Sequence, residues 1–140
     1  MSGSVSISVS ISLSISISSR QISEGLCAAL YDEEKCSRSS SFLELRPGDQ
    51  GVLPLLTTGL RRNDVESLIV SYRCKLELWD DDSGLRNNPD RPDLVIDRTS
   101  RLNFGRNKYV DSLADDDDYE HMDEKISAYR CTCRESTLGK

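Results

Sequence analysis

The amino-acid sequence predicts an all-β protein, a sandwich of two Greek-key motifs preceded by one extended β-strand. Three observations predict this class. Residues 4–18 alternate serine with an aliphatic residue without a break, which is the side-chain period of a strand. The remaining chain divides into two related halves, each with a series of short strand patterns separated by turns. Neither half shows a helical period, and paired units of this kind are typical of a β-sandwich.

The alternating segment places serine on one face and only aliphatic side chains on the other. Extended at roughly 3.3 Å per residue, residues 4–18 would span on the order of 50 Å, whereas ordinary strands have ~5–6 residues. We therefore expect residues 1–20 to be an assembly segment and residues 21–140 to be the folded domain. The predicted assembly face consists of Val5, Ile7, Val9, Ile11, Leu13, Ile15 and Ile17.

Four interpretations of the alternating segment remain open. It could donate a strand to the sheet edge of a neighbouring copy, or stack with identical segments into a shared sheet. It could also be a disordered serine-rich tail, or a strand of a membrane barrel. A barrel strand needs aromatic girdles, and no aromatic residue precedes Tyr31. Disorder usually goes with few β-branched residues, so we favour donation or stacking, with a homo-oligomer or homopolymer as the product.

Composition limits the possible partners. The net charge is −6, and acidic residues cluster at 80–82 and 115–118. Proteins that bind nucleic acid usually carry a basic face, so no nucleic-acid partner is expected. Such acidic runs suit hard cations such as calcium better than polyanions.

The cysteines do not have the spacing of a zinc site. None forms a C-x-x-C pair, and His121 is the single histidine. The odd number allows disulfides with one thiol left over, five thiols, or a disulfide between chains, and the pairing stays open. We expect an oxidised, extracellular protein, although no signal-peptide pattern is visible, because serine interrupts any apolar h-region. The five cysteines are Cys27, Cys36, Cys74, Cys131 and Cys133.

An internal repeat relates the two halves of the domain. Tyr31 and Trp79 each end an alternating strand and precede an acidic run. Later in each half, Asn63-Asp64-x-x-Ser67 matches Asp123-Glu124-x-x-Ser127 at a spacing of 60 residues.

The repeat defines the predicted boundaries of the Greek keys. The aromatic residues are 48 positions apart and the later elements are 60 apart, so the second half carries about twelve extra residues. We assign them to the polar, proline-bearing turn region at 84–93. The first Greek key is then predicted at 26–73 and the second at 74–133.

These residues resemble the βγ-crystallin superfamily over roughly residues 26–133. The most specific marks are the stretch 45–49 (LRPGD), the paired loop elements just described, and the strand 74–79. The family's first hairpin usually carries an aromatic residue and a glycine at two places that here hold Cys36 and Arg38, then Gly84 and Arg86. The resemblance therefore implies two Greek keys with rebuilt hairpins.

The resemblance also implies two calcium ions. Each loop element is expected beside an acidic turn, the first beside 32–34 and the second beside 80–82, and the serine of each motif is implied to complete the site of the other. Calcium prefers six to eight oxygen ligands, so bound ions would clip the Greek keys together. The alternative is ordinary turn chemistry. The expected ligands, some through backbone carbonyls, are Glu33, Asn63, Asp64, Ser67, Asp81, Asp123, Glu124 and Ser127.

The sequence offers no persuasive catalytic arrangement. A single histidine gives no triad, and no glycine-rich phosphate loop occurs. The leading hypothesis is a non-enzymatic, calcium-binding structural protein that assembles into a fibre or matrix through its N-terminal strand. The alternative is a soluble, secreted binding module or toxin-like effector with the same fold, and a third option is an intracellular, stress-linked calcium-binding protein.

Overall fold

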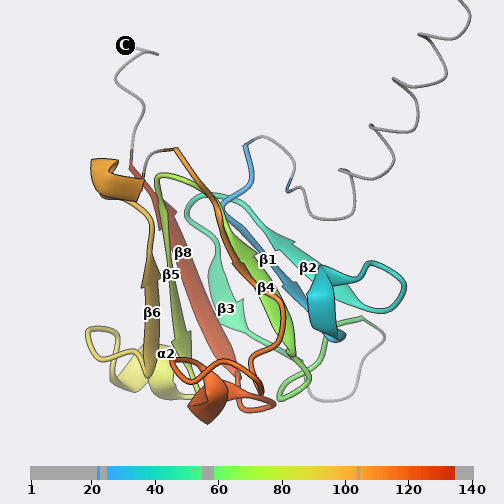
Figure 1. Ribbon diagram of the computed structural model, residues 1–140. Helices are drawn as coiled ribbons and strands as arrows, with labels where there is room; N and C mark the ends of the chain where they lie inside the picture. Colours follow the sequence, from blue (N-terminus) through green and yellow to red (C-terminus); the bar gives the residue numbers. More distant parts are fainter. Residues whose placement is uncertain (1–21, 23–24, 55–58, 104, 135–140) are drawn as a thin grey trace, which may run out of the picture.

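Eight short strands form two antiparallel sheets that pack face to face (Figure 1). The computed structural model describes residues 22, 25–54, 59–103 and 105–134, and these counts refer to that part of the chain. The predicted assembly segment at residues 1–20 lies outside it. Within the same ranges, no helix is long and apolar enough to cross a membrane. The all-β sandwich predicted from the sequence is confirmed.

The eight strands are divided equally between the two sheets. In spatial order, the first sheet contains β2 (Phe42–Leu45), β1 (Ala28–Tyr31), β4 (Ser67–Val70) and β7 (Lys108–Val110). The second contains β3 (Gln50–Val52), β8 (Ala128–Cys133), β5 (Cys74–Trp79) and β6 (Leu94–Asp97). The short helical segments are η1 (Glu34–Cys36), α2 (Gly84–Asn87), η2 (Arg101–Asn103) and η3 (Glu120–Met122).

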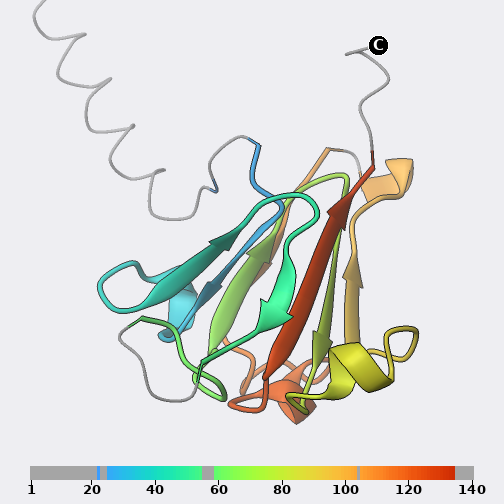
Figure 2. The same cartoon turned by 180° about the vertical axis from the view of Figure 1, so that it is seen from behind.

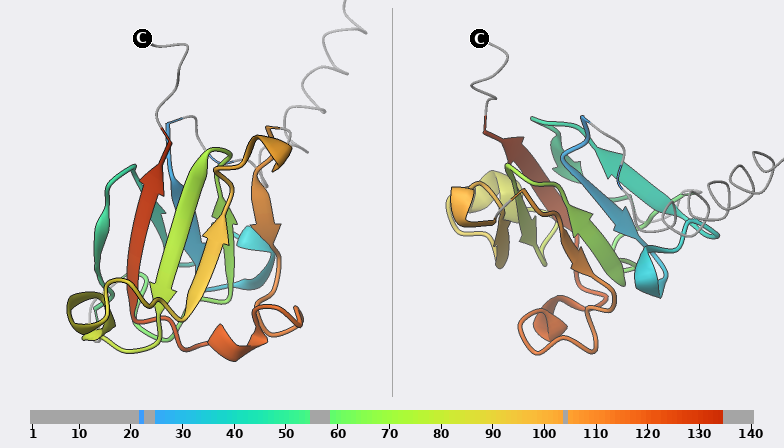
Figure 3. Two further views of the ribbon diagram at one scale, coloured as in Figure 1. Left: turned by 90° about the vertical axis from the view of Figure 1, so that its left-hand side faces the viewer. Right: turned by 45° about the horizontal axis from the view of Figure 1, so that its top comes forward.

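Each half of the chain gives its third strand to the sheet of the other half. Three strands of the first half, β2, β1 and β4, are joined by β7 from the second half. Three strands of the second half, β6, β5 and β8, are joined in the same way by β3. The two sheets therefore have equivalent orders, and views of the sandwich from behind and from the side show both four-stranded layers (Figures 2 and 3). Neither half completes a four-stranded sheet without the other.

The main core lies between the sheets. Leu30 and Leu68 from the first sheet and Leu76 and Leu78 from the second are fully buried in one cluster. On the first sheet, residues of opposite parity point to the outer face, where Ala29, Tyr31, Cys36 and Ile69 form a second buried cluster. This explains why β1 reads as a continuous apolar run, AALY, and is buried at every position.

Two disulfides lie near the end of the sandwich where β5 begins and β8 ends, which is the upper end in Figure 1. Cys27, just before β1, is bonded to Cys131 in β8, and Cys74 is bonded to Cys133 across the β5–β8 pair. The first bond joins the two halves directly, over a separation of 104 residues, and the second closes 59 residues. In the chain-entropy model, loops of this size each stabilise by about 4–5 kcal/mol. Cys36 takes part in neither disulfide and is buried.

The insertion of the second half is more ordered than the sequence indicates. Residues 84–93 were expected to be a turn region, but its first four residues form α2. Gly84 makes this possible because it packs on Trp79, whose indole N–H donates to the carbonyl of Asn88 (2.9 Å). The helix therefore forms as a lid on the buried tryptophan.

Gly84→Ala is expected to lower the free energy of unfolding by about 1–3 kcal/mol, the usual cost of overpacking. A β-carbon at this position would lie 2.7 Å from Cδ1 of Trp79. The ring cannot move away easily, because it is 1% exposed and hydrogen-bonded. Urea unfolding followed by tryptophan fluorescence measures the change.

Asn87→Ala is the matched control, because Asn87 ends the same short helix with an exposed side chain. It should change the free energy of unfolding by less than about 0.5 kcal/mol. Equal stability of both variants would contradict the close packing of Gly84 on the indole.

Candidate functional site

The predicted ligand residues gather at the lower end of the sandwich in Figure 1, opposite the disulfides. They belong to loops that precede β4 and β8 and to turns that follow β1 and β5. Strand exchange brings loops of the two halves together here. The amide of Asn63, in the first half, donates to the carbonyl of Ile126 in the second (2.9 Å).

Three oxygen atoms converge around Ser127. Its hydroxyl oxygen lies 3.2 Å from the backbone carbonyl oxygen of Asp80 and 3.4 Å from Oδ1 of Asn63. Ser127 as a whole is 2% exposed. A hydroxyl has one proton and can donate it to only one of these acceptors. The three-oxygen group, as we call Asn63 Oδ1, Ser127 Oγ and Asp80 O, is therefore electron-rich and includes atoms from both halves.

The corresponding hydroxyl of the first half is differently arranged. Ser67 donates to the carbonyl of Glu33 and accepts a hydrogen bond from the amide of Cys36 (2.9 Å). Ser67 is 0% exposed. Its hydroxyl thus both donates and accepts within the protein, and only one lone pair of the oxygen is left over.

The loop before β4 meets both acidic turns. It was predicted beside the turn at 32–34, where Glu66 does lie, but Asn63 and Arg62 are linked to the turn at 80–82. The link through Ser127 reaches the Asp80 carbonyl, and Nη1 of Arg62 lies 3.0 Å from Asp82. The reason is strand pairing, which places Ser127 next to the end of β5 and Ser67 next to the end of β1.

The loop at 123–124 faces the first half instead. Glu66 is surrounded by carboxylates from both halves: Glu124 and Asp123 from this loop, and Glu34 and Asp32 from the turn after β1. Partial burial, followed by the negative charge of these neighbours, raises the pKa of Glu66 above its ordinary value. Oδ1 of Asp32 and Oδ1 of Asp123 are both buried and have no hydrogen-bond partner. Negative charge and unsatisfied hydrogen-bond acceptors are therefore concentrated around Glu66, away from the three-oxygen group.

The repeat has a spacing of 61 residues at these loops, not the 60 predicted from the sequence. Asn63 and Glu124 both have positive φ, 67° and 55°. The amides of Glu66 and Ser127 play the same part, donating to the carbonyls of Tyr31 and Trp79 (both 2.8 Å).

Two further pairs agree with the spacing of 61. Val65 and Ile126 are both 0% exposed, and the amides of Asp64 and Lys125 both donate to a carbonyl three residues earlier. Ser127 is therefore the structural counterpart of Glu66, not of Ser67. Lys125 stands where the first loop has Asp64, so the two loops differ in charge at equivalent positions.

Several predicted ligand side chains already have protein partners. Oδ1 of Asp81 accepts hydrogen bonds from the amide and hydroxyl of Ser83 (both 3.0 Å), which lower the pKa of Asp81. Asp64 forms an ion pair with Arg61 (3.0 Å), and the Glu33 carboxylate accepts from Ser39 (3.0 Å). The backbone carbonyl near Ser127 is that of Asp80, one residue before the predicted Asp81.

The residues present fit a cation through mixed oxygen donors and not through a carboxylate cage. Within the described part of the chain, one group of three His, Cys, Asp or Glu side chains has its ligand atoms within 4.8 Å of each other, and it consists of cysteines. Calcium accepts carbonyl, amide and hydroxyl oxygens beside carboxylates, as in the three-oxygen group. Sequence reasoning missed Asp80 and Glu66, because a backbone carbonyl and an unmatched glutamate leave no motif.

His121 has no arrangement typical of a catalytic base. It is exposed, and Nε2 of its ring lies 3.4 Å from the backbone carbonyl of Asp93. A general base must reach the proton that it removes and is usually oriented by a second polar side chain. Nothing in these contacts points to acid–base chemistry.

Comparison with known proteins finds likeness in structure only. No family model and no curated protein matches the sequence. A solved βγ-crystallin domain from Flavobacterium johnsoniae is similar, with 17% identity, coverage of 79% of this chain and 99% of that one, and a TM-score of 0.44. A mutant βγ-crystallin domain from Clostridium beijerinckii has 15% identity, coverage of 76% and 97%, and a TM-score of 0.41. Both matches belong to the superfamily that the sequence resembles.

Glu66→Gln is expected to stabilise the protein at neutral pH and not in acid. A carboxyl whose pKa is raised on folding binds its proton more tightly in the folded state. The contribution of this carboxyl to the free energy of unfolding is then fully present below its ordinary pKa. It is lost as the pH rises through the pKa of the folded protein. Urea unfolding in calcium-free buffer should give equal free energies for both proteins below about pH 4 and a higher value for the variant above about pH 6.

Glu120→Gln provides the control, because Glu120 is an exposed glutamate at the same end of the molecule. It should follow the wild-type profile. A constant offset for Glu66→Gln across the whole pH range would show that the effect does not come from titration.

Proposed function

We propose that this protein is a non-enzymatic structural protein whose two Greek keys are clamped by calcium. The observation that carries the proposal is the three-oxygen group, in which Asn63 of the first half meets Ser127 and Asp80 of the second. An ion bound there would contact both halves at once. Since it would bind the folded state and not the unfolded one, it would stabilise the sandwich by linkage.

The three-oxygen group would be the stronger of two calcium sites. Asp81 and Asp82 follow Asp80 directly and would add negative charge, with water completing the six to eight ligands. Asp80 supports this view, because burial and its neighbours Asp93 and Asp81 raise its pKa, which is the mark of crowded negative charge. A cation would relieve that crowding.

The second calcium site would be weaker and would lie around the carbonyl of Glu33. The unsatisfied oxygens of Asp32 and Asp123 support a cation there, and so do the charges of Glu66 and Glu124. The hydroxyl of Ser67 is already engaged as donor and acceptor, which lowers its value as a ligand.

Ser127→Ala is expected to weaken the tighter calcium site about tenfold or more, because it removes one ligand and the link between the halves. Ser67→Ala should affect only the weaker site. Isothermal titration calorimetry with calcium measures both sites, and thermal unfolding with calcium against chelator measures the linked stabilisation.

Ser100→Ala, at an exposed position beside η2 and away from the acidic loops, is the matched control and should titrate as wild type. Absence of heat and of thermal stabilisation in the wild-type protein would refute calcium binding. Equal affinities in wild type and Ser127→Ala would refute the proposed site.

We further propose that the protein assembles with copies of itself through the alternating N-terminal segment. The described residues between 26 and 133 bury a core of their own, and an aliphatic face on the alternating segment would serve to join another chain. The sheets end in four edge strands, β2, β7, β3 and β6. Exposed apolar side chains on three of these edges, Val52, Val95 and Tyr109, support strand addition.

Removal of residues 1–20 is expected to abolish assembly and leave a folded monomer. Size-exclusion chromatography with light scattering and negative-stain microscopy would compare the full chain with a chain that begins at Gln21. Replacement of Ile7, Ile11 and Ile15 by serine keeps the length and should also give monomers, because it interrupts the apolar face at three of its seven positions. A full chain that stays monomeric at high concentration would contradict the proposal.

An extracellular location fits this function. Structural disulfides persist in oxidising compartments and are rare where glutathione keeps thiols reduced. Two disulfides among the described residues therefore support a secreted fibre or matrix protein over an intracellular one.

A further inference from the structure

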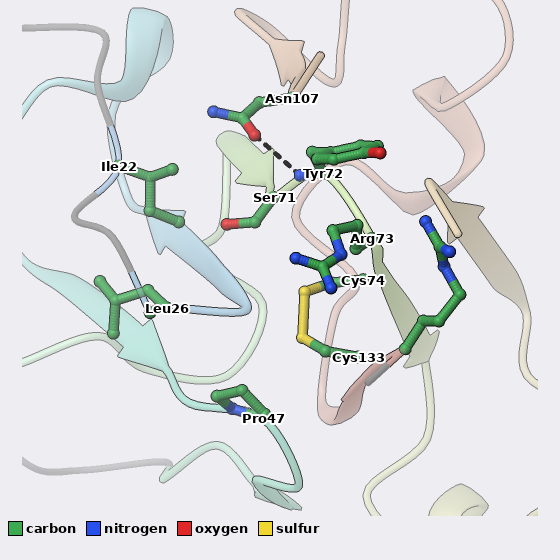
Figure 4. A pocket seen from close by; sticks show the side chains of 11 residues that line it. Ile22, Leu26, Pro47, Ser71, Tyr72, Arg73, Cys74, Asn107 and Cys133 are labelled. Atoms are coloured by element: carbon green, nitrogen blue, oxygen red, sulfur yellow. Dashed lines mark hydrogen bonds between the residues drawn. A yellow bond between two sulfur atoms is a disulfide. The ribbon is translucent and has the colours of Figure 1, made fainter. Parts of the chain in front are cut away.

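A pocket opens at the upper end of the sandwich, opposite the acidic loops, and the Cys74–Cys133 disulfide forms part of its wall (Figure 4). The pocket has a volume of about 330 Å³. Its apolar wall includes Leu26 and Pro47, and its polar wall is formed by residues 71–74 together with Arg134. A space of this size suits a small organic molecule.

The pocket is basic although the protein is acidic. Arg73 and Arg134 line it, and none of its described lining residues is acidic. The net charge of the whole chain is −6, so this concentration of positive charge is local. In a partly enclosed site, two guanidinium groups favour an anion, and carboxylates match their donor geometry.

Two hydrogen-bond donors of the pocket have no partner in the protein. Oγ of Ser71 is buried and unpaired, and Ser71 as a whole is 9% exposed. Nε of Arg134 is also buried without a partner. Buried polar groups are normally hydrogen-bonded, so these donors indicate a ligand that supplies acceptor oxygens.

The disulfide in the pocket is accessible to a small reactant. Cys133 is partly exposed, whereas Cys27 and Cys131 of the other disulfide are both 0% exposed and do not line the pocket. The sulfur atoms of Cys27, Cys74 and Cys133 lie within 4.8 Å of one another. The two disulfides are therefore neighbours, with one facing the pocket and the other behind it.

We propose that this pocket binds small thiols that carry carboxylates and that they exchange with the Cys74–Cys133 disulfide. The carboxylates would pair with the arginines and accept from Ser71. The thiolate sulfur would attack Sγ of Cys133, which forms a mixed disulfide and breaks the Cys74–Cys133 bond. The electron pair leaves on Sγ of Cys74 as a thiolate, so no oxidant or other reductant is needed.

The released Cys74 thiolate can undergo a second exchange reaction with the neighbouring Cys27–Cys131 disulfide. By attacking Sγ of Cys27 it forms a Cys27–Cys74 bond and releases Cys131 as a thiolate, which then takes a proton. The pocket thus couples the redox state of its surroundings to the bond that joins the two halves of the sandwich.

Thiol exchange by the native full-length protein tests this assignment. Glutathione, which carries two carboxylates, is compared with cysteamine, which carries an amine, at equal thiolate concentration. Quenching with iodoacetamide and peptide mass spectrometry then locate the adduct. We expect glutathione to react about tenfold faster than cysteamine, with its adduct on Cys133.

Two further measurements isolate the role of the arginines. The double variant Arg73→Gln/Arg134→Gln should lose the preference for glutathione. Arg86→Gln/Arg91→Gln changes the net charge equally at exposed positions of the opposite end and should keep it. In the wild-type protein, 0.5 M salt shortens the Debye length to roughly 4 Å and should also abolish the preference for glutathione. This measurement does not depend on whether any variant folds.

The measured rates and the position of the adduct decide the proposal. A preference for glutathione that disappears with the pocket arginines and with salt, together with an adduct on Cys133, supports the proposal. Equal rates for the two thiols, an adduct confined to another cysteine, or no adduct at all would overturn it.

Discussion

The exchange of third strands is the constraint on which the rest of this structure depends. Because β3 pairs with β8 and β7 with β4, the loop after each third strand begins beside the other half. The amide of Leu53 donates to the carbonyl of Ser127, and that of Leu113 donates to the carbonyl of Glu66 (both 2.8 Å). These paired bonds hold the acidic loops of both halves at one end of the molecule. A candidate cation site shared by the halves is thus a consequence of the topology.

The two ends of the sandwich are held by different chemistry. At the end with the disulfides, Cys27–Cys131 fixes the first half to the second by a covalent bond. At the other end, the halves meet through hydrogen bonds and through carboxylates such as Asp123, whose negative charge adds to partial burial in raising the pKa of Glu66. Repulsion among such groups favours separation unless a cation offsets it. The acidic end is therefore the part of the fold that a bound cation would stabilise most.

The fold was predictable from the sequence, and the details of the site were only partly so. Alternating strands, two related halves and the corner residues Tyr31 and Trp79, which are 2% and 1% exposed, are set by period and burial. The spacing of the second repeat element could not be predicted in the same way. An alignment by residue type pairs Ser67 with Ser127, whereas the structure pairs Val65 with Ile126. Packing decides the register, since each loop must bury one apolar side chain. The clustering of cysteines 27, 74, 131 and 133 depends on pairing between distant strands and has no local signature.

The shift of one residue gives two similar serines different capacities. Ser67 begins β4 and meets the Glu33 carbonyl, two residues after Tyr31, with the amide of Cys36 donating to its oxygen. Ser127 precedes β8 and meets the Asp80 carbonyl, one residue after Trp79, with a second acceptor nearby and no amide donor among its described contacts. A metal ion needs free lone pairs, and the second hydroxyl retains more of them. Because of the same shift, Lys125 occupies the position in the second loop that Asp64 occupies in the first. The two matching serines of the repeat therefore have different surroundings in space, and the difference follows from the side chain that each loop buries.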